Sequence, residues 1–235
     1  MDGERRPRAR LDRWTWPGLF VVAISIVLLR VQPSRMHELP RGMLTPVVAL
    51  ELARTPEEVE RIFGRDPEER ARFDVRMTRA TFIDFALLAT YGIFLAGVAY
   101  ELSRDGSYAA RAGVVLALGA AGFDAAENAQ LLRIFANLGG DYREAVATLS
   151  YVTWGKWWCL GAYFVAVARA AWTFGGFARA ACVCGVIGAA ASVVAQPLRG
   201  VAAEIMLNGT SVGIAGLVVA SYRQRIEVQR RVKKP

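Results

Sequence analysis

Two carboxylates and one carboxamide lie near the middle of an apolar stretch that is long enough to cross a membrane. Within residues 111–136, Glu127 and Asn128 follow Asp124 by three and four positions. On an α-helix this spacing places the three side chains on one face. A charged carboxylate that faces hydrocarbon costs at least about 2.5 kcal/mol. We therefore expect this face to turn toward protein or enclosed water, where it forms the centre of a polar site.

Other apolar stretches carry polar side chains that are candidates for the same site. Asp84 and Tyr91 are seven positions apart and share one helical face. Glu204 and Asn208 are four positions apart in the last apolar stretch and also share a face. Lys156 is the one cation that the sequence places firmly inside an apolar stretch. Ionisable groups at such positions are rare in membrane helices and often mark ion or ligand sites.

The composition indicates the class of protein that holds these residues. The chain has 235 residues, of which 54% are hydrophobic, and its mean hydropathy is +0.28. Weakly charged runs of about 17–22 residues recur, which is the length that crosses about 30 Å of hydrocarbon. We predict an all-α, polytopic membrane helix bundle that forms one domain over residues 1–235. The six predicted transmembrane segments are residues 14–31, 80–102, 111–135, 148–172, 177–195 and 201–221.

The long loop between the first two segments, residues 32–79, is predicted to form short amphipathic helices on the extracytoplasmic side. Thr55 precedes Pro56 and two glutamates, which is typical of a capped helix start, and Gly64 ends that helix. A second start at Asp66 is expected to continue into the segment beginning at residue 80. Residues 46–53 are apolar except for Glu51, and we expect them to lie in the membrane interface or to dip toward the bundle.

The distribution of charged residues predicts how the chain is oriented in the membrane. The formal net charge is +8, and the excess of Lys and Arg lies mainly at the two ends of the chain, beside membrane segments. The positive-inside rule and anionic lipid headgroups account for this pattern, so both termini are predicted to be cytoplasmic, in a bacterial inner membrane. The lipid bilayer is the expected partner, and nucleic acid is not. The first apolar segment has no cleavage pattern after it and is expected to be an uncleaved anchor.

Cysteine and histidine are too few to suggest a metal centre or a His-based triad. His37 is the only histidine, and the three cysteines all fall in apolar segments, where cysteine behaves as a small hydrophobic residue. The sequence leaves the cofactor unknown.

The predicted topology allows the depths of the polar groups to be compared. Glu127 and Lys156 each lie about 12 Å below the outer end of their helices, at 1.5 Å per residue. These helices are consecutive and antiparallel, so we expect the two side chains to pair. The other candidates lie about 6–17 Å below the same surface. We therefore predict one polar pocket that opens outward, with residues 46–79 as its lid.

These residues also have structural interpretations. The polar groups could be interhelical pairs that only fix helix register. Lys156 lies among three tryptophans and could extend to the interface, and Asp84 is near enough to the surface to be solvated. Tyr91 is often a packing residue. The last two apolar runs could form one broken helix, and Gly209-x-x-x-Gly213 could support helix packing or a homo-oligomer.

Taken together, several motifs resemble a group of uncharacterised bacterial integral membrane proteins that carry an intramembrane Asp-x-x-Glu-Asn motif and a later intramembrane lysine. The resemblance covers about residues 15–172. It rests on residues 50–57, 82–85, 89–92, 123–128 and 155–156. It implies the same membrane fold and supports the choice of site residues, but it implies no reaction.

Three functions are compatible with the sequence. The first is a non-enzymatic accessory subunit of a larger complex, or a ligand-binding membrane module. The second is a proton- or cation-coupled transporter that uses Asp124, Glu127 and Lys156. The third is a membrane-embedded hydrolase or isomerase with Asp124 or Glu127 as the base.

Overall fold

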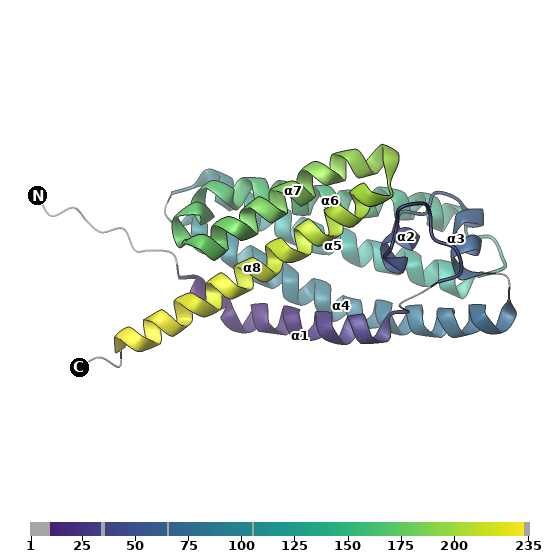
Figure 1. The fold of residues 1–235 in the computed structure, drawn as a ribbon, viewed down its shortest axis with the longest axis horizontal. Helices are drawn as coiled ribbons and strands as arrows, with labels where there is room; N and C mark the ends of the chain where they lie inside the picture. The colour runs from purple at the N-terminus through teal and green to yellow at the C-terminus, as the bar shows by residue number, and fades with distance from the viewer. Residues whose placement is uncertain (1–9, 34–35, 65, 105, 233–235) are drawn as a thin grey trace, which may run out of the picture.

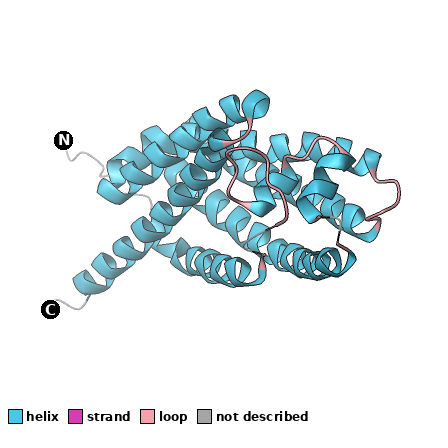
Figure 2. Cartoon of the chain, turned by 45° about the vertical axis from the view of Figure 1, so that its right-hand side comes forward, coloured by secondary structure: helices cyan, strands magenta, loops and turns pink. Residues whose placement is uncertain are grey.

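A computed structural model describes residues 10–33, 36–64, 66–104 and 106–232. All regular secondary structure in these ranges is helical (Figure 2). Several basic residues near the two ends of the chain lie outside the described residues: Arg5, Arg6, Arg8, Lys233 and Lys234. The same is true of Asp105 in the turn between the second and third predicted segments.

Within the described residues, six long helices make up the bundle. They are α1 (Thr15–Val31), α4 (Pro67–Ser103), α5 (Tyr108–Ala136), α6 (Arg143–Ala171), α7 (Gly176–Leu198) and α8 (Val201–Val232). Four short helices join them, namely η1 (Leu11–Trp14), α2 (Pro46–Glu51), α3 (Pro56–Phe63) and η2 (Trp172–Phe174).

Consecutive long helices pack side by side, and α1 lies against both α4 and α8. In Figure 1, α1 and α4 run along the lower side and α7 along the upper side, with α5 and α6 between them, while α8 crosses diagonally from the α7 side to the level of α1. The short helices α2 and α3 lie at one end of the bundle, and η1 and the end of α8 lie at the other (Figure 1). We call the first the outer-loop end, after the predicted orientation, and the second the termini end.

Five of the long helices are long and apolar enough to cross a membrane: α1 with η1, α4, α5, α7 and α8. The chain thus has the features of a multi-pass membrane protein. The predicted segment 148–172 lies in α6, which spans 29 residues but is not among the five. Five candidate spans are therefore found where about six were predicted, and α6 packs between α5 and α7.

The outer loop is shorter than its predicted extent. Asp66 caps α4 by accepting a hydrogen bond from the Glu68 N–H at 3.3 Å, and α4 then continues unbroken for 37 residues. The predicted continuation of this helix into the second apolar segment is confirmed, and residues 67–79 are part of a long helix and not of a separate lid. The helix start at Thr55 is also present, with the Thr55 side chain accepting from the Glu58 N–H at 3.3 Å.

The last two apolar runs are two helices joined by a tight turn. Arg199 and Gly200 have φ angles of 52° and 60°, a left-handed conformation that reverses the chain between α7 and α8. Arg199 is the one non-glycine residue with positive φ in the described ranges. This turn excludes the alternative of a single broken helix.

Close backbone packing between α7 and α8 gives a first testable prediction. A Cβ atom added at Gly209 would lie 2.8 Å from the Cys184 carbonyl oxygen and 2.9 Å from the Gly188 nitrogen. Because both are backbone atoms, Gly209→Ala must push the helices apart, and we expect it to destabilise the protein by about 1–3 kcal/mol. Thermal unfolding of the detergent-purified protein measures the effect. Gly122→Ala is the matched control, since its Cβ meets nothing within 4 Å; equal effects of the two variants would refute the prediction.

Candidate functional site

The most concentrated polar group in the described structure surrounds Lys156. Its Nζ lies 3.2 Å from Glu51 Oε2 and 3.2 Å from Asp124 Oδ1, and it forms an ion pair with Glu127 Oε1. We call Glu51, Asp124, Glu127 and Lys156 the lysine cluster. Its members come from α2, α5 and α6, so the pairing of Glu127 with Lys156 expected from equal depth is present, and Glu51 joins it from the outer loop.

The lysine cluster is buried. Lys156 is 5% exposed and Glu127 is 1% exposed, while Asp124 and Glu51 are 6% and 8% exposed. The Lys156 Nζ also lies 5.1 Å from the centre of the Trp157 ring, at cation–π distance. Lys156 therefore does not extend to the membrane surface, which corrects the alternative of an interfacial lysine.

Further hydrogen bonds connect the lysine cluster to α4. The Tyr91 hydroxyl donates to Asp124 Oδ2 at 2.8 Å, so Tyr91 is a polar partner as well as a packing residue. One turn toward the outer-loop end, the Asn128 amide donates to Asp84 Oδ2 at 2.8 Å. The two α4 residues that share a face thus both meet the polar face of α5.

The lysine cluster contains more acidic than basic side chains. Three carboxylates surround one ammonium, so the group carries two excess negative charges if every carboxyl is ionised. In addition, Glu127 Oε2 is buried with no hydrogen-bond partner in the described structure. An uncompensated buried charge costs several kcal/mol. The arrangement therefore favours bound protons or an additional cation, and chemically it is suited to exchanging either.

Glu204 and Asn208 lie apart from the lysine cluster, which corrects the expectation of one shared pocket. Glu204 is in the first turn of α8, where its Oε1 accepts from the N–H groups of Leu44 and Thr45 at 2.7 and 2.8 Å. The Thr45 hydroxyl donates to Glu204 Oε2 at 2.7 Å. Glu204 therefore ties the segment before α2 to α8.

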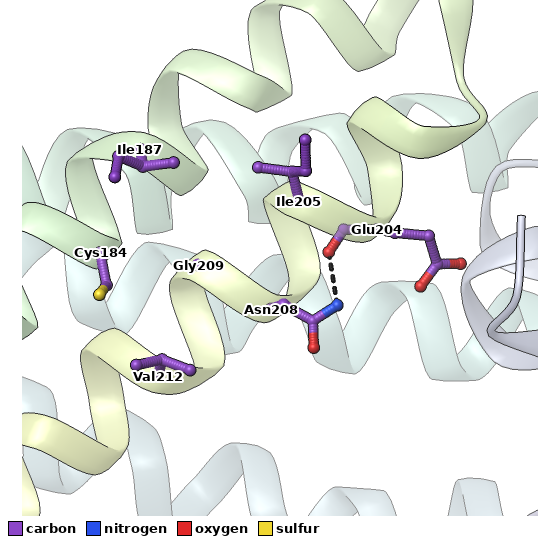
Figure 3. A pocket seen from close by; sticks show the side chains of 7 residues that line it. All are labelled: Cys184, Ile187, Glu204, Ile205, Asn208, Gly209 and Val212. Carbon is purple, nitrogen blue, oxygen red and sulfur yellow. Dashed lines mark hydrogen bonds between the residues drawn. The ribbon is translucent and has the colours of Figure 1, made fainter. Parts of the chain in front are cut away.

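Asn208 lines a shallow groove of about 310 Å³ between α7 and α8. Its amide donates to the backbone oxygen of Glu204 at 2.7 Å, while the Glu204 carboxylate points away toward the outer loop (Figure 3). The other lining residues are Glu204 and the group Cys184, Ile187, Ile205, Gly209 and Val212. The groove is therefore largely apolar, and no member of the lysine cluster lines it.

A second ion pair, not predicted from the sequence, joins α3 to the α7–α8 turn. Arg199 donates to both carboxylate oxygens of Glu58, at 2.7 and 2.9 Å, and to the backbone oxygen of Leu52 at 3.0 Å. These bonds hold the pKa of Glu58 below its ordinary value of 4.5. Glu58 does not complete a capping box with Thr55, because its carboxylate accepts instead from the Arg54 N–H. Its position suggested only a helix cap, so this contact could not be found from local sequence.

A larger cavity lies at the termini end and is also separate from the lysine cluster. It has a volume of about 650 Å³ and is lined by η1, the α6–α7 turn and α8, including Leu11, Phe174 and Arg223. Neither cavity contacts Glu51, Asp124, Glu127 or Lys156. Since its residues are at most 8% exposed, the lysine cluster is closed in this conformation.

No protein-family model, curated protein or solved structure matches this chain.

Proposed function

We propose that the chain is a six-span protein of a bacterial inner membrane, with α6 as the remaining span and both termini in the cytoplasm. The length of α6 and its position between α5 and α7 support this assignment. Arginine–aromatic contacts near the termini end support the orientation: Arg223 and Arg225 lie 4.3 and 5.1 Å from the ring centres of Phe177 and Trp16. Basic and aromatic residues together are typical of a cytoplasmic membrane interface.

Within this membrane protein, we infer that the lysine cluster is a proton- and cation-binding site of a non-enzymatic module. The observation that carries the inference is the contact of one buried ammonium with three carboxylates from two different elements. In the described conformation the Lys156 ammonium occupies the position of a bound cation. Protons on the remaining carboxyl groups balance the charge, and the free Oε2 of Glu127 is the natural position for one of them.

This function predicts a protonated carboxyl group at neutral pH. We expect the infrared spectrum of the purified protein at pH 7 to contain the C=O band of a buried carboxylic acid, and alkaline titration to remove it. Glu127→Gln should weaken this band, because it removes the carboxyl with the unpartnered oxygen and leaves two carboxyl groups beside Lys156. Glu144→Gln is the control, since Glu144 is exposed in the first turn of α6. A spectrum in which all carboxyl groups of the wild type are ionised at pH 7 would exclude the proposal.

A second candidate is an accessory subunit of a larger membrane complex, in which the lysine cluster only fixes the packing of α2, α5 and α6. The closed state of the lysine cluster favours this alternative, because no residue of it contacts either cavity. The infrared titration separates the two functions: a site that exchanges protons responds to pH, whereas a purely structural cluster keeps the same band until the protein unfolds.

A further inference from the structure

The segment that carries Glu51 is held on both sides by the α7–α8 turn. Before α2, Leu44 and Thr45 bond to Glu204 in the first turn of α8. After α2, the Leu52 carbonyl accepts from Arg199, and the Arg54 guanidinium donates to the Gln196 carbonyl. A displacement of this turn is therefore expected to displace residues 44–54 as well.

The same segment closes the lysine cluster from the outer-loop end. Glu51 reaches inward to Lys156 at 3.2 Å, and the Thr153 hydroxyl of α6 donates to the Glu51 carbonyl at 3.2 Å. Thr153 is 0% exposed beneath it. Glu51 is thus the one member of the lysine cluster that belongs to a short loop helix and not to a long helix of the bundle.

The next helix along the chain, α3, is joined to Arg199 through Glu58 and has further contacts with α5 and α6. In α3, Phe63 packs against Phe135 near the end of α5, with ring centres 5.8 Å apart, and the Tyr142 hydroxyl at the start of α6 donates to the Pro56 carbonyl at 3.3 Å. These two contacts do not involve the α7–α8 turn, so α3 keeps its place on α5 and α6 when the bonds of Arg199 and Glu204 break, whereas residues 44–54 lose their contacts with the turn.

These contacts lead to one inference, which rests on the function proposed above. We propose that residues 44–54 form a gate over the lysine cluster, and that the α7–α8 turn controls this gate through Glu204 and Arg199. Opening separates Glu51 from Lys156 and leaves Lys156 with Asp124 and Glu127. The cluster then faces the outer-loop side, where protons or cations can enter. Val48, Ala49 and Leu50 are almost fully buried, so the closed state predominates and opening is infrequent.

A buried reporter beneath the gate tests the proposal. Thr153→Cys is introduced after the native Cys159, Cys182 and Cys184 have been replaced by serine, and labelling by a water-soluble maleimide is timed. We expect Arg199→Gln and Glu204→Gln each to accelerate labelling by about tenfold or more, because each removes charge-assisted hydrogen bonds from the closed state. Arg133→Gln is the control, since Arg133 lies at the same end but bonds only to its neighbours within α5 and the following turn.

A second reporter distinguishes opening of the gate from loosening of the whole protein. Ser221→Cys lies at the termini end and is also 0% exposed. Faster labelling at residue 153 with unchanged labelling at residue 221 supports the gate. Unchanged labelling at residue 153, or equal acceleration at both positions, overturns it. The infrared result does not affect this measurement, so a cluster that fails to exchange protons and a gate that fails to open are recognised separately.

Discussion

Replacing Lys156 with methionine is expected to destabilise the protein by about 3–5 kcal/mol, because it removes the cation and leaves buried carboxylates without a partner. Three carboxylates contact the ammonium directly, and the site has almost no access to solvent. Methionine preserves most of the side-chain volume, so the loss reports charge and not a cavity. Denaturant or thermal unfolding in detergent micelles measures the change.

A double variant identifies charge as the cause of this loss. Glu127→Gln removes one of the buried carboxyl groups that must otherwise ionise or bind a proton, so in the Lys156→Met background it should recover part of the lost stability. Glu144→Gln in the same background should recover nothing, since Glu144 lies outside the lysine cluster. If Lys156→Met is as stable as the wild type, then the lysine cluster does not hold ionised groups in the way described here.

The second large effect is expected at the ion pair between α3 and the α7–α8 turn. Glu58→Gln weakens two charge-assisted hydrogen bonds from Arg199, each of which contributes about 1.5–3 kcal/mol. The side chains of Arg199 and Glu58 are only 19% and 17% exposed, so solvent screening reduces this contribution only in part. We expect faster hydrogen–deuterium exchange in residues 44–63 and little change in α5 and α6.

The same pair makes the outer loop sensitive to acid. Arg199 lowers the pKa of Glu58 in the folded protein below 4.5, so the stabilisation is complete above that pH and is lost as the pH falls through the lowered pKa. Protection of residues 44–63 from exchange should therefore stay constant between about pH 7 and 5 and decrease below about pH 4. In Glu58→Gln this acid-dependent step should disappear; a step that persists unchanged would assign it to another group.

Hydrophobic run length accounts for most of the fold that the sequence predicted. Five of the expected spans are helices with the required length and apolarity. The α6 segment is harder to recognise, because Lys156 and the charged residues at both of its ends lower its hydropathy. Helix ends were predictable where capping residues mark them, as at Thr55 and Asp66.

The site could be predicted only where helix geometry determines the contact. Glu127 and Lys156 lie at equal depth on consecutive antiparallel helices, and that information is sufficient to place them together. Glu51 was a candidate from its apolar surroundings, but a loop has no fixed period from which to derive its contact with Lys156. Glu204 is an acidic residue in an apolar stretch, as a member of the site would be. However, it lies at the start of α8, where its carboxylate accepts hydrogen bonds from backbone N–H groups of the outer loop.

The backbone at Arg199 has a consequence for how this part of the molecule unfolds. A side chain other than glycine in that conformation costs about 1–3 kcal/mol, and the bonds of its guanidinium to Glu58 and Leu52 offset the cost. If those bonds break, the backbone cost at Arg199 is no longer offset, and the turn between α7 and α8 is weakened. The loop around α2 and the α7–α8 turn should therefore unfold together as one cooperative unit, before the remainder of the bundle.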